Sequence, residues 1–179
     1  MTVIEQQIPT GTWVADRIHS SVAFEVKHMV VATFRSKFDD YEARLTVEDG
    51  EPKLVGTVQV ASIEARDERL AGHLQSPDFF DAERTPELHF ESTAFRHDGD
   101  ELTVEGDLTI RGVTRQVAAH GAIAGPHVNI AGDEGLGLEL ETTVDRTDYG
   151  LGWNASLPKG GFALANDVKL KISLELVRQ

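Results

Sequence analysis

The sequence predicts an all-β protein, an extended antiparallel β-barrel with one short helical insert. Polar and apolar residues alternate along most of the 179 residues, which is the period of a strand with one buried face. Turn-forming residues separate the alternating segments, and no strand–helix–strand spacing is present. Long strands joined by hairpin-like turns favour a sheet that curls and closes on itself.

The chain divides into a short arm and one domain. Residues 1–10 show no hydrophobic period, whereas the pattern changes from Trp13 onwards. We therefore predict a flexible N-terminal arm over 1–10 and a single barrel domain over 11–179. A chain of this length with 40% hydrophobic residues can bury a substantial core.

Four alternating segments precede the insert, at 21–27, 34–38, 41–48 and 54–60. In the first of them Val22, Phe24 and Val26 share one face, opposite polar or small residues. An Asp-Gly-Glu-Pro turn at 49–52 separates the last two segments. Each of these segments is expected to be a strand with one face in the barrel interior.

Residues 62–93 contain the stretch where the alternation stops. Leu70 and Leu74 stand four residues apart, on one face of a helix. The Ser-Pro-Asp tripeptide at 76–78 is typical of an N-cap followed by proline at the first helical position. We predict two short helical turns, the second containing two adjacent phenylalanines, which pack against or plug one end of the barrel.

Five alternating segments follow the insert, at 88–93, 102–110, 117–123, 136–144 and 167–176. The His-Asp-Gly-Asp sequence at 97–100 is a hairpin turn, and Arg-Gly-Val-Thr at 111–114 turns the chain again. Glycine-rich connections at 124–135 and 149–161 flank the fourth segment, and Trp153 lies within the second connection. These segments complete a sheet of roughly eight or more strands.

Composition excludes several classes of function. With 30 acidic and 17 basic residues the net charge is −13, which argues against a nucleic-acid partner. Cysteine is absent, so a disulfide framework and a thiolate metal site are both excluded. The N-terminal sequence lacks signal-peptide features, and no apolar run reaches the roughly 18 residues of a membrane span. We therefore expect a cytoplasmic protein without a membrane-spanning segment.

The histidines and acidic residues form no recognisable catalytic or metal motif. The seven histidines lack H-x-H and H-E-x-x-H spacing, so we expect no metal and no cofactor. Asp16, His19 and Ser20 look like part of a catalytic triad, but no G-x-S-x-G turn accompanies them. A turn held by hydrogen bonds is the favoured interpretation. A small enzyme that acts on an apolar substrate with Asp16, His19 and Arg66 at one barrel end stays open as an alternative.

Two further polar groups are candidate head-group or structural residues. Arg66 could bind an anionic head group at the barrel mouth, although a helix cap centred on Asp67 is the favoured interpretation. Arg146 and Asp148 are predicted to form an internal ion pair, because a buried arginine has to be paired.

The apolar faces predict a ligand cavity. A barrel of eight strands is about the size at which the interior is either filled or holds one small ligand. Several inward positions are small, namely Ala43, Gly56, Gly106, Ala119 and Gly121, which favours a cavity over a filled barrel acting as a stress-related structural module. The candidate ligand contacts are Phe24, Val26, Met29, Phe34, Phe38, Val58, Val60, Leu74, Phe79, Phe80, Phe90, Leu108 and Trp153. Burying about ten tail carbons gains roughly 8 kcal/mol against an association cost of about 4–15 kcal/mol, so only a long tail binds usefully.

The motifs together resemble the YceI-like family of polyisoprenoid-binding, lipocalin-like proteins. The resemblance is carried by WVADRIHS at 13–20, FEVKHM at 24–29, DFFD at 78–81, GDLTIRGVT at 106–114 and RTDYG at 146–150. It implies a lipocalin-like barrel, a hydrophobic channel for a prenyl tail, frequently a homodimer, and no catalytic machinery. On this basis we expect a carrier for an amphiphilic isoprenoid, such as a prenyl-quinone precursor or a polyprenyl phosphate.

Overall fold

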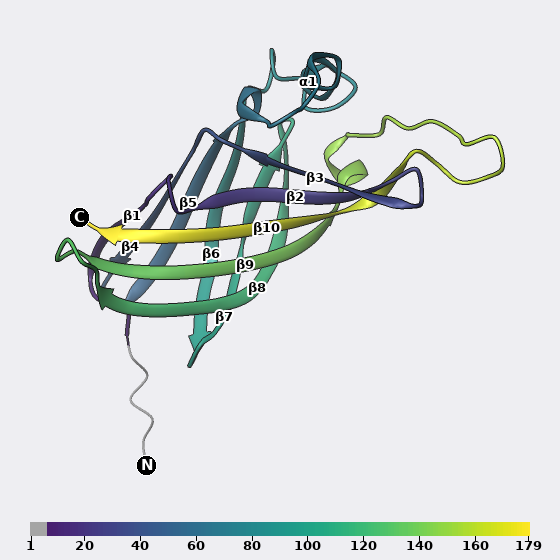
Figure 1. Cartoon of the computed structure of the whole chain (residues 1–179). Coiled ribbons are helices and arrows are strands. Elements are labelled where there is room, and N and C mark those ends of the chain that lie inside the picture. The colour runs from purple at the N-terminus through teal and green to yellow at the C-terminus, as the bar shows by residue number, and fades with distance from the viewer. Residues whose placement is uncertain (1–6) are drawn as a thin grey trace.

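The computed structural model describes residues 7–179, and the predicted antiparallel barrel is confirmed there. Ten strands form one sheet in the order β1-β4-β5-β6-β7-β8-β9-β10-β2-β3 within these residues. An additional β1–β10 pairing closes β1 and β4–β10 into an eight-stranded barrel (Figure 1). The strands are β1 (Gly11–Ala15), β2 (Ser21–His28), β3 (Ala32–Phe38), β4 (Tyr41–Glu48), β5 (Glu51–Gln59), β6 (Glu87–Asp98), β7 (Glu101–Ile110), β8 (Val113–Val128), β9 (Glu134–Asp145) and β10 (Leu164–Arg178).

Alternation positions the side chains as the sequence predicts. In β4, Tyr41, Ala43, Leu45 and Val47 are buried and the residues between them are mostly exposed. All pairings are antiparallel, so successive strands present their apolar residues to one interior. The structure assigns the first strand, β1, to the residues just before the predicted turn at Asp16 and His19, and it extends β8 well beyond the predicted segment at 117–123.

The hairpin formed by β2 and β3 lengthens one side of the wall. β10 pairs with β1 near its C-terminal end, where Leu176 faces Ala15, and with β2 further back, where Val168 faces Val26. The connection between β1 and β2 is the predicted hydrogen-bonded turn, since the Asp16 carboxylate accepts a bond from the backbone N–H of Ile18. The β2–β3 turn therefore reaches beyond the end of β1 (Figure 1).

The insert contains one α-helix, α1 (Glu68–Gln75), and two 3₁₀ turns lie elsewhere in the described chain, η1 (Val60–Ser62) and η2 (Arg146–Tyr149). The predicted cap is confirmed, because the Asp67 carboxylate accepts bonds from the N–H groups of Arg69 and Leu70. Within residues 7–179 no helix has the length and apolarity needed to cross a bilayer.

The predicted second helical turn is wrong. Residues 76–85 form hydrogen-bonded turns instead, with the Phe80 N–H donating to the Leu74 carbonyl and the Asp81 N–H to the Ser76 carbonyl. Both Phe79 and Phe80 pack against the same apolar cluster. Adjacent residues of an α-helix cannot face one direction, so the irregular turns satisfy a packing requirement that a helix would break.

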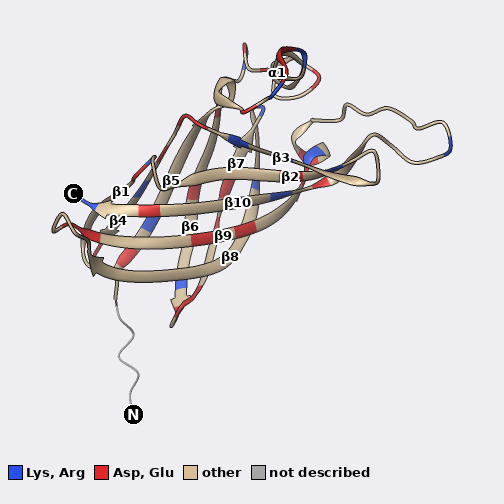
Figure 2. Cartoon of the chain, in the orientation of Figure 1, with Lys and Arg blue, Asp and Glu red and all other residues tan. Residues whose placement is uncertain are grey.

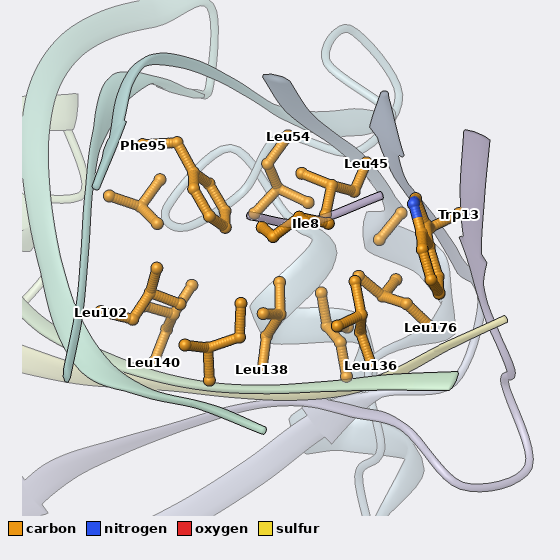
Figure 3. Packing of buried hydrophobic residues seen from close by; sticks show 14 of the residues in the cluster. Ile8, Trp13, Leu45, Leu54, Phe95, Leu102, Leu136, Leu138, Leu140 and Leu176 are labelled. Atoms are coloured by element: carbon orange, nitrogen blue, oxygen red, sulfur yellow. The ribbon is translucent and has the colours of Figure 1, made fainter. Parts of the chain in front are cut away.

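One end of the barrel, which we call the closed end, is filled by side chains. Its cluster comprises Ile8, Trp13, Ala43, Leu45, Val47, Leu54, Phe95, Leu102, Val104, Ala119, Ile123, Leu136, Leu138, Leu140, Leu174 and Leu176. Figure 3 shows Ile8 between side chains that come from opposite walls. Residues 1–6 of the predicted flexible arm lie outside the described residues, whereas Ile8 is buried and anchors the adjoining segment to the barrel.

Candidate functional site

A small apolar cavity, the inner cavity, lies next to the closed end. Its volume is about 160 Å³. Inward residues of many strands line it, among them Val58, Phe90 and Leu108, together with the small side chain of Ala119. The polar residues at its edge, Glu42 and His89, lie at exposed positions of β4 and β6, so the interior wall is almost purely hydrocarbon.

A larger cavity, the outer cavity, continues toward the opposite end of the barrel. Its volume is about 390 Å³, within the range of roughly 300–1,000 Å³ that ligand sites occupy. The inner and outer cavities share the lining residues Phe24, Phe38, Leu88, Ile110 and Leu170. They therefore adjoin across these side chains. We call the two cavities together the channel, and it stops at the packed cluster of the closed end.

Aromatic rings build the wall and roof of the outer cavity. Phe24 packs on Phe34 and Phe38 with ring centroids 6.1 and 5.8 Å apart, and Phe38 meets Phe80 edge-on at 5.9 Å. These separations lie in the range of about 4.5–7 Å that favours aromatic pairs.

The loop that follows η2 is held over the cavity by a second aromatic group. Trp153 lies 5.4 Å from Phe79, and the His73 ring stands at right angles between them, 4.9 Å from each. His73 belongs to α1 and Phe79 to the turns after it, so α1 and the loop 150–163 support each other. We call this end of the barrel, opposite the closed end, the open end. Side chains from segments that are distant in sequence partly cover it.

Twelve of the thirteen predicted ligand contacts line the channel. They are Phe24, Val26, Met29, Phe34, Phe38, Val58, Leu74, Phe79, Phe80, Phe90, Leu108 and Trp153. Val60 lines neither cavity, because it is fully buried at the start of η1. Whether these residues contact a ligand stays a prediction.

Several lining residues were missed in the sequence. Val168 and Leu170 on β10 follow the alternation that predicts β10, so the pattern could have identified them. Tyr149 and Leu151 lie in η2 and in the glycine-rich connection, where no period exists to mark a buried face. They line the outer cavity only because the loop 150–163 folds over the end of the barrel.

Arg146 is buried beside the outer cavity without the predicted ion pair. Its guanidinium donates hydrogen bonds to the carbonyls of Leu151, Trp153 and Ala165. No carboxylate of the described residues lies within salt-bridge distance of it, and Asp148 is exposed, so the predicted Arg146–Asp148 pair is wrong. Burial lowers the pKa of Arg146, and the nearby Asp145 charge opposes that shift. Carbonyl dipoles thus replace a counter-ion, and Arg146 fixes the loop that roofs the channel.

Two buried tyrosine hydroxyls have no hydrogen-bond partner among residues 7–179. They belong to Tyr41, which lines the inner cavity, and Tyr149, which lines the outer cavity. Burial raises the pKa of both hydroxyl groups, which therefore stay protonated and can donate. An unsatisfied buried hydroxyl is unfavourable by roughly 1–3 kcal/mol, so both groups are costs that the apolar packing around them offsets.

Known proteins identify this architecture. The profile of the YceI-like domain matches residues 13–176. The chain belongs to the YceI-like family. A UPF0312 protein of Staphylococcus aureus (strain N315) is 30% identical over 164 residues, covering 89% of this chain and 94% of that protein.

Three solved structures share the fold. The YceI protein of Campylobacter jejuni superposes with a TM-score of 0.71 at 26% identity, over 86% of this chain and 90% of that one. BcnA of Burkholderia cenocepacia gives 0.76 at 22% identity, over 92% and 99% of the two chains. A polyisoprenoid binding domain from Saccharophagus degradans, implicated in plant cell wall breakdown, gives 0.68 at 10% identity, over 96% and 100%.

The predicted polar residues at the start of this YceI-like barrel do not line the channel. Asp16 and His19 are joined by a 2.8 Å hydrogen bond, and their ligating atoms lie within 4.8 Å of those of Glu175. The hydrogen bond lowers the pKa of Asp16 and raises that of His19. Arg66 is exposed and lines neither cavity. Asp16 and His19 therefore hold the β1–β2 turn, outside the apolar interior.

Proposed function

We propose that this YceI-like protein binds and carries an amphiphilic polyisoprenoid without chemically changing it. The observation that carries the proposal is the pair of adjoining apolar cavities, closed at one end by Ile8 and its neighbours. A long hydrocarbon chain gains about 0.8 kcal/mol for each buried CH₂, so depth in such a channel translates into affinity. The fold shared with a polyisoprenoid binding domain supports the same class of ligand.

The distribution of polar groups favours one orientation of the ligand. The outer cavity is lined by His28, His73, Arg146 and Tyr149, whereas the inner cavity is almost purely hydrocarbon, and its polar side chains other than Tyr41 are exposed or hydrogen-bonded. Thr142, for example, donates to the Ala118 carbonyl. We therefore infer that the apolar tail fills the inner cavity and the head group stays in the outer cavity. A head group with an acceptor oxygen, such as a phenol, quinone or phosphate, suits the hydrogen-bond donors among the side chains that line the outer cavity.

The alternative functions have less support. An enzyme that uses Asp16, His19 and Arg66 needs these groups at a substrate pocket, but none of them lines the channel. A filled structural barrel needs an interior without cavities, which the channel contradicts. A homodimer stays a prediction, and sedimentation velocity tests it.

Native mass spectrometry tests the carrier function most directly. Protein purified without detergent from its host is expected to carry a lipid of isoprenoid mass, and delipidated protein is expected to take up added prenyl chains. Phe80→Asp adds a carboxylate to the channel wall and should weaken uptake at least about tenfold while the fold is kept. Ile18→Asp is the matched control, since Ile18 is exposed and lies outside the channel. Absence of bound lipid and of uptake would overturn the proposal.

A further inference from the structure

An exposed apolar group lies at the open end of the barrel. The β2–β3 turn presents Met29, Val30 and Val31, and Val31 is 87% exposed. Phe162, which is 60% exposed, belongs to the loop 150–163 that extends beside this turn in Figure 1. We call these four residues the apolar tip. Large apolar side chains that gather at one exposed site mark an interaction surface.

The two segments of the apolar tip are fastened together. The Met29 N–H donates to the Ala163 carbonyl at 2.7 Å, which joins the turn to the residue after Phe162. A methyl group of Val30 packs directly against Gly161, only 3.2 Å from where a Cβ would stand. Val30 and Phe162 also border one surface hollow together with Lys27. The tip is therefore one continuous surface.

The apolar tip is continuous with the channel. Met29 lines the outer cavity and is also exposed, and its neighbour His28 does the same. Ala163 and Leu164, which follow Phe162, line the same cavity. A surface bound to the tip would therefore lie against the open end of the channel.

The charge around the apolar tip is opposite in sign to that of the whole chain. The protein has a net charge of −13, yet residues 26–38 and 150–166 contain no Asp or Glu. Lys27 and Lys159 flank the tip, and neither is within salt-bridge distance of a carboxylate in residues 7–179. Figure 2 shows the loop with a basic residue at its end and no acidic residue along it.

The backbone of the turn disfavours the residues that form the tip. Met29 and Val30 have φ angles of 53° and 67°, in the left-handed region. Gly, Asn and Asp are the residues that usually adopt a positive φ, and a β-branched residue is strained there. An exposed valine at a strained position is a backbone outlier of the kind that clusters at functional sites.

We propose that the apolar tip docks on an anionic lipid bilayer and brings the open end of the channel to the membrane surface. Apolar side chains beside unpaired lysines are the composition of surfaces that insert into an anionic interface. A second copy of the chain fits less well, because two facing tips would bring Lys27 and Lys159 against their own copies. Delivery of an isoprenoid through this contact rests on the proposed function, whereas the docking itself does not.

Flotation with vesicles free of isoprenoid tests the docking. The full chain is expected to bind vesicles of phosphatidylcholine containing phosphatidylglycerol more tightly than vesicles of phosphatidylcholine alone, and to lose binding at high salt. Val31→Asp and Phe162→Asp should each weaken binding at least about tenfold, and Lys159→Gln roughly fivefold. Ile130→Asp is the matched control, because Ile130 is fully exposed in the β8–β9 turn at the other end of the barrel (Figure 1).

Three outcomes of the vesicle experiment overturn the docking proposal. One is the absence of vesicle binding, and another is equal binding by the parent and the tip variants. A third is self-association of the parent that Val31→Asp abolishes, which would assign the tip to a second copy. Uptake of prenyl chains, measured without vesicles, is scored separately. A protein that binds vesicles but takes up no prenyl chain would refute the carrier function and leave the docking intact.

Discussion

The closed and open ends of the barrel are built from the same alternating strands, yet one is solid and the other hollow. At the closed end, aliphatic side chains meet from opposite walls, and Ile8 and Trp13 fill the space that remains. At the open end, the walls carry phenylalanine rings and the volume between them is empty. A two-residue period decides which side chains face inward. The sizes of the side chains that meet across the barrel decide whether the space is filled.

Contacts between side chains of the same wall stabilise the open end. Phe24 touches both Phe34 and Phe38, so each ring is held by its neighbours along the wall. Short side chains at Gly56 and Ala119 keep the inner cavity open. A ligand that binds the folded protein in such a cavity raises its apparent stability by about 2.7 kcal/mol at a hundredfold excess over Kd. The melting temperature should therefore rise on addition of prenyl chains.

The largest effect on stability is expected at the closed end. Trp13→Ala removes a fully buried indole from the packed cluster and should destabilise the fold by about 3–5 kcal/mol. Phe34→Ala at the open end should destabilise it less, because Phe34 is half-buried and already borders a cavity. Urea unfolding of both variants measures the difference. Equal losses would show that the two ends are packed alike.

Two glycines on the inward face sharpen the comparison within the barrel wall. A Cβ at Gly106 would lie 2.5 Å from the Phe90 ring and from the Glu91 carbonyl, so Gly106→Ala should destabilise by about 1–3 kcal/mol. A Cβ at Gly56 would have its nearest neighbour at 3.7 Å, so Gly56→Ala should change stability by less than about 0.5 kcal/mol. Thermal unfolding measures both, and a tolerant Gly106 would mean that both the Phe90 ring and the backbone at Glu91 can move.

At the strained β2–β3 turn of the open end, a substitution should raise the stability of the fold, whereas the substitutions above lower it. Val30→Gly relieves a left-handed valine with φ 67° and should stabilise the fold by about 1 kcal/mol, while it weakens vesicle binding. Val31→Gly is the control, since Val31 has no positive φ and gains nothing from glycine. Unfolding and flotation of the two variants separate backbone strain from surface chemistry. A loss of stability in Val30→Gly would contradict the strain.

The smallest effect is expected at the Asp16–His19 turn, which lies outside both ends of the channel. The folded pKa of His19 is raised above 6.5 by Asp16, so its stabilisation is present below that pH and is lost as the pH rises through the folded pKa. The folded pKa of Asp16 is lowered below 3.8 by His19, so its stabilisation is lost as the pH falls through that lower value. His19→Asn should therefore lower the melting temperature slightly between pH 3.8 and 6.5 and not at all well above the folded pKa of His19. A difference that persists at alkaline pH would assign His19 another role.

Prediction from the sequence worked where a regular backbone repeats its own pattern. The inward residues of β4 and β10 and the cap at Asp67 follow from period and local hydrogen bonding alone. Prediction from the sequence failed where the contact that fixes a residue comes from a distant part of the chain. Arg146 is satisfied by carbonyls of a loop, and Ile8 is buried although its segment has no period.

The amino-acid sequence by itself determined that the chain is a curled antiparallel sheet with one oily face, because alternation assigns every strand residue to a side. Only the tertiary structure decided which part of the interior is empty and where the channel opens. Both depend on the meeting of distant segments: Ile8 with the far wall, and the β2–β3 turn with the loop around Phe162. The volume left between such segments is a property of the closed barrel, which no single stretch of sequence contains.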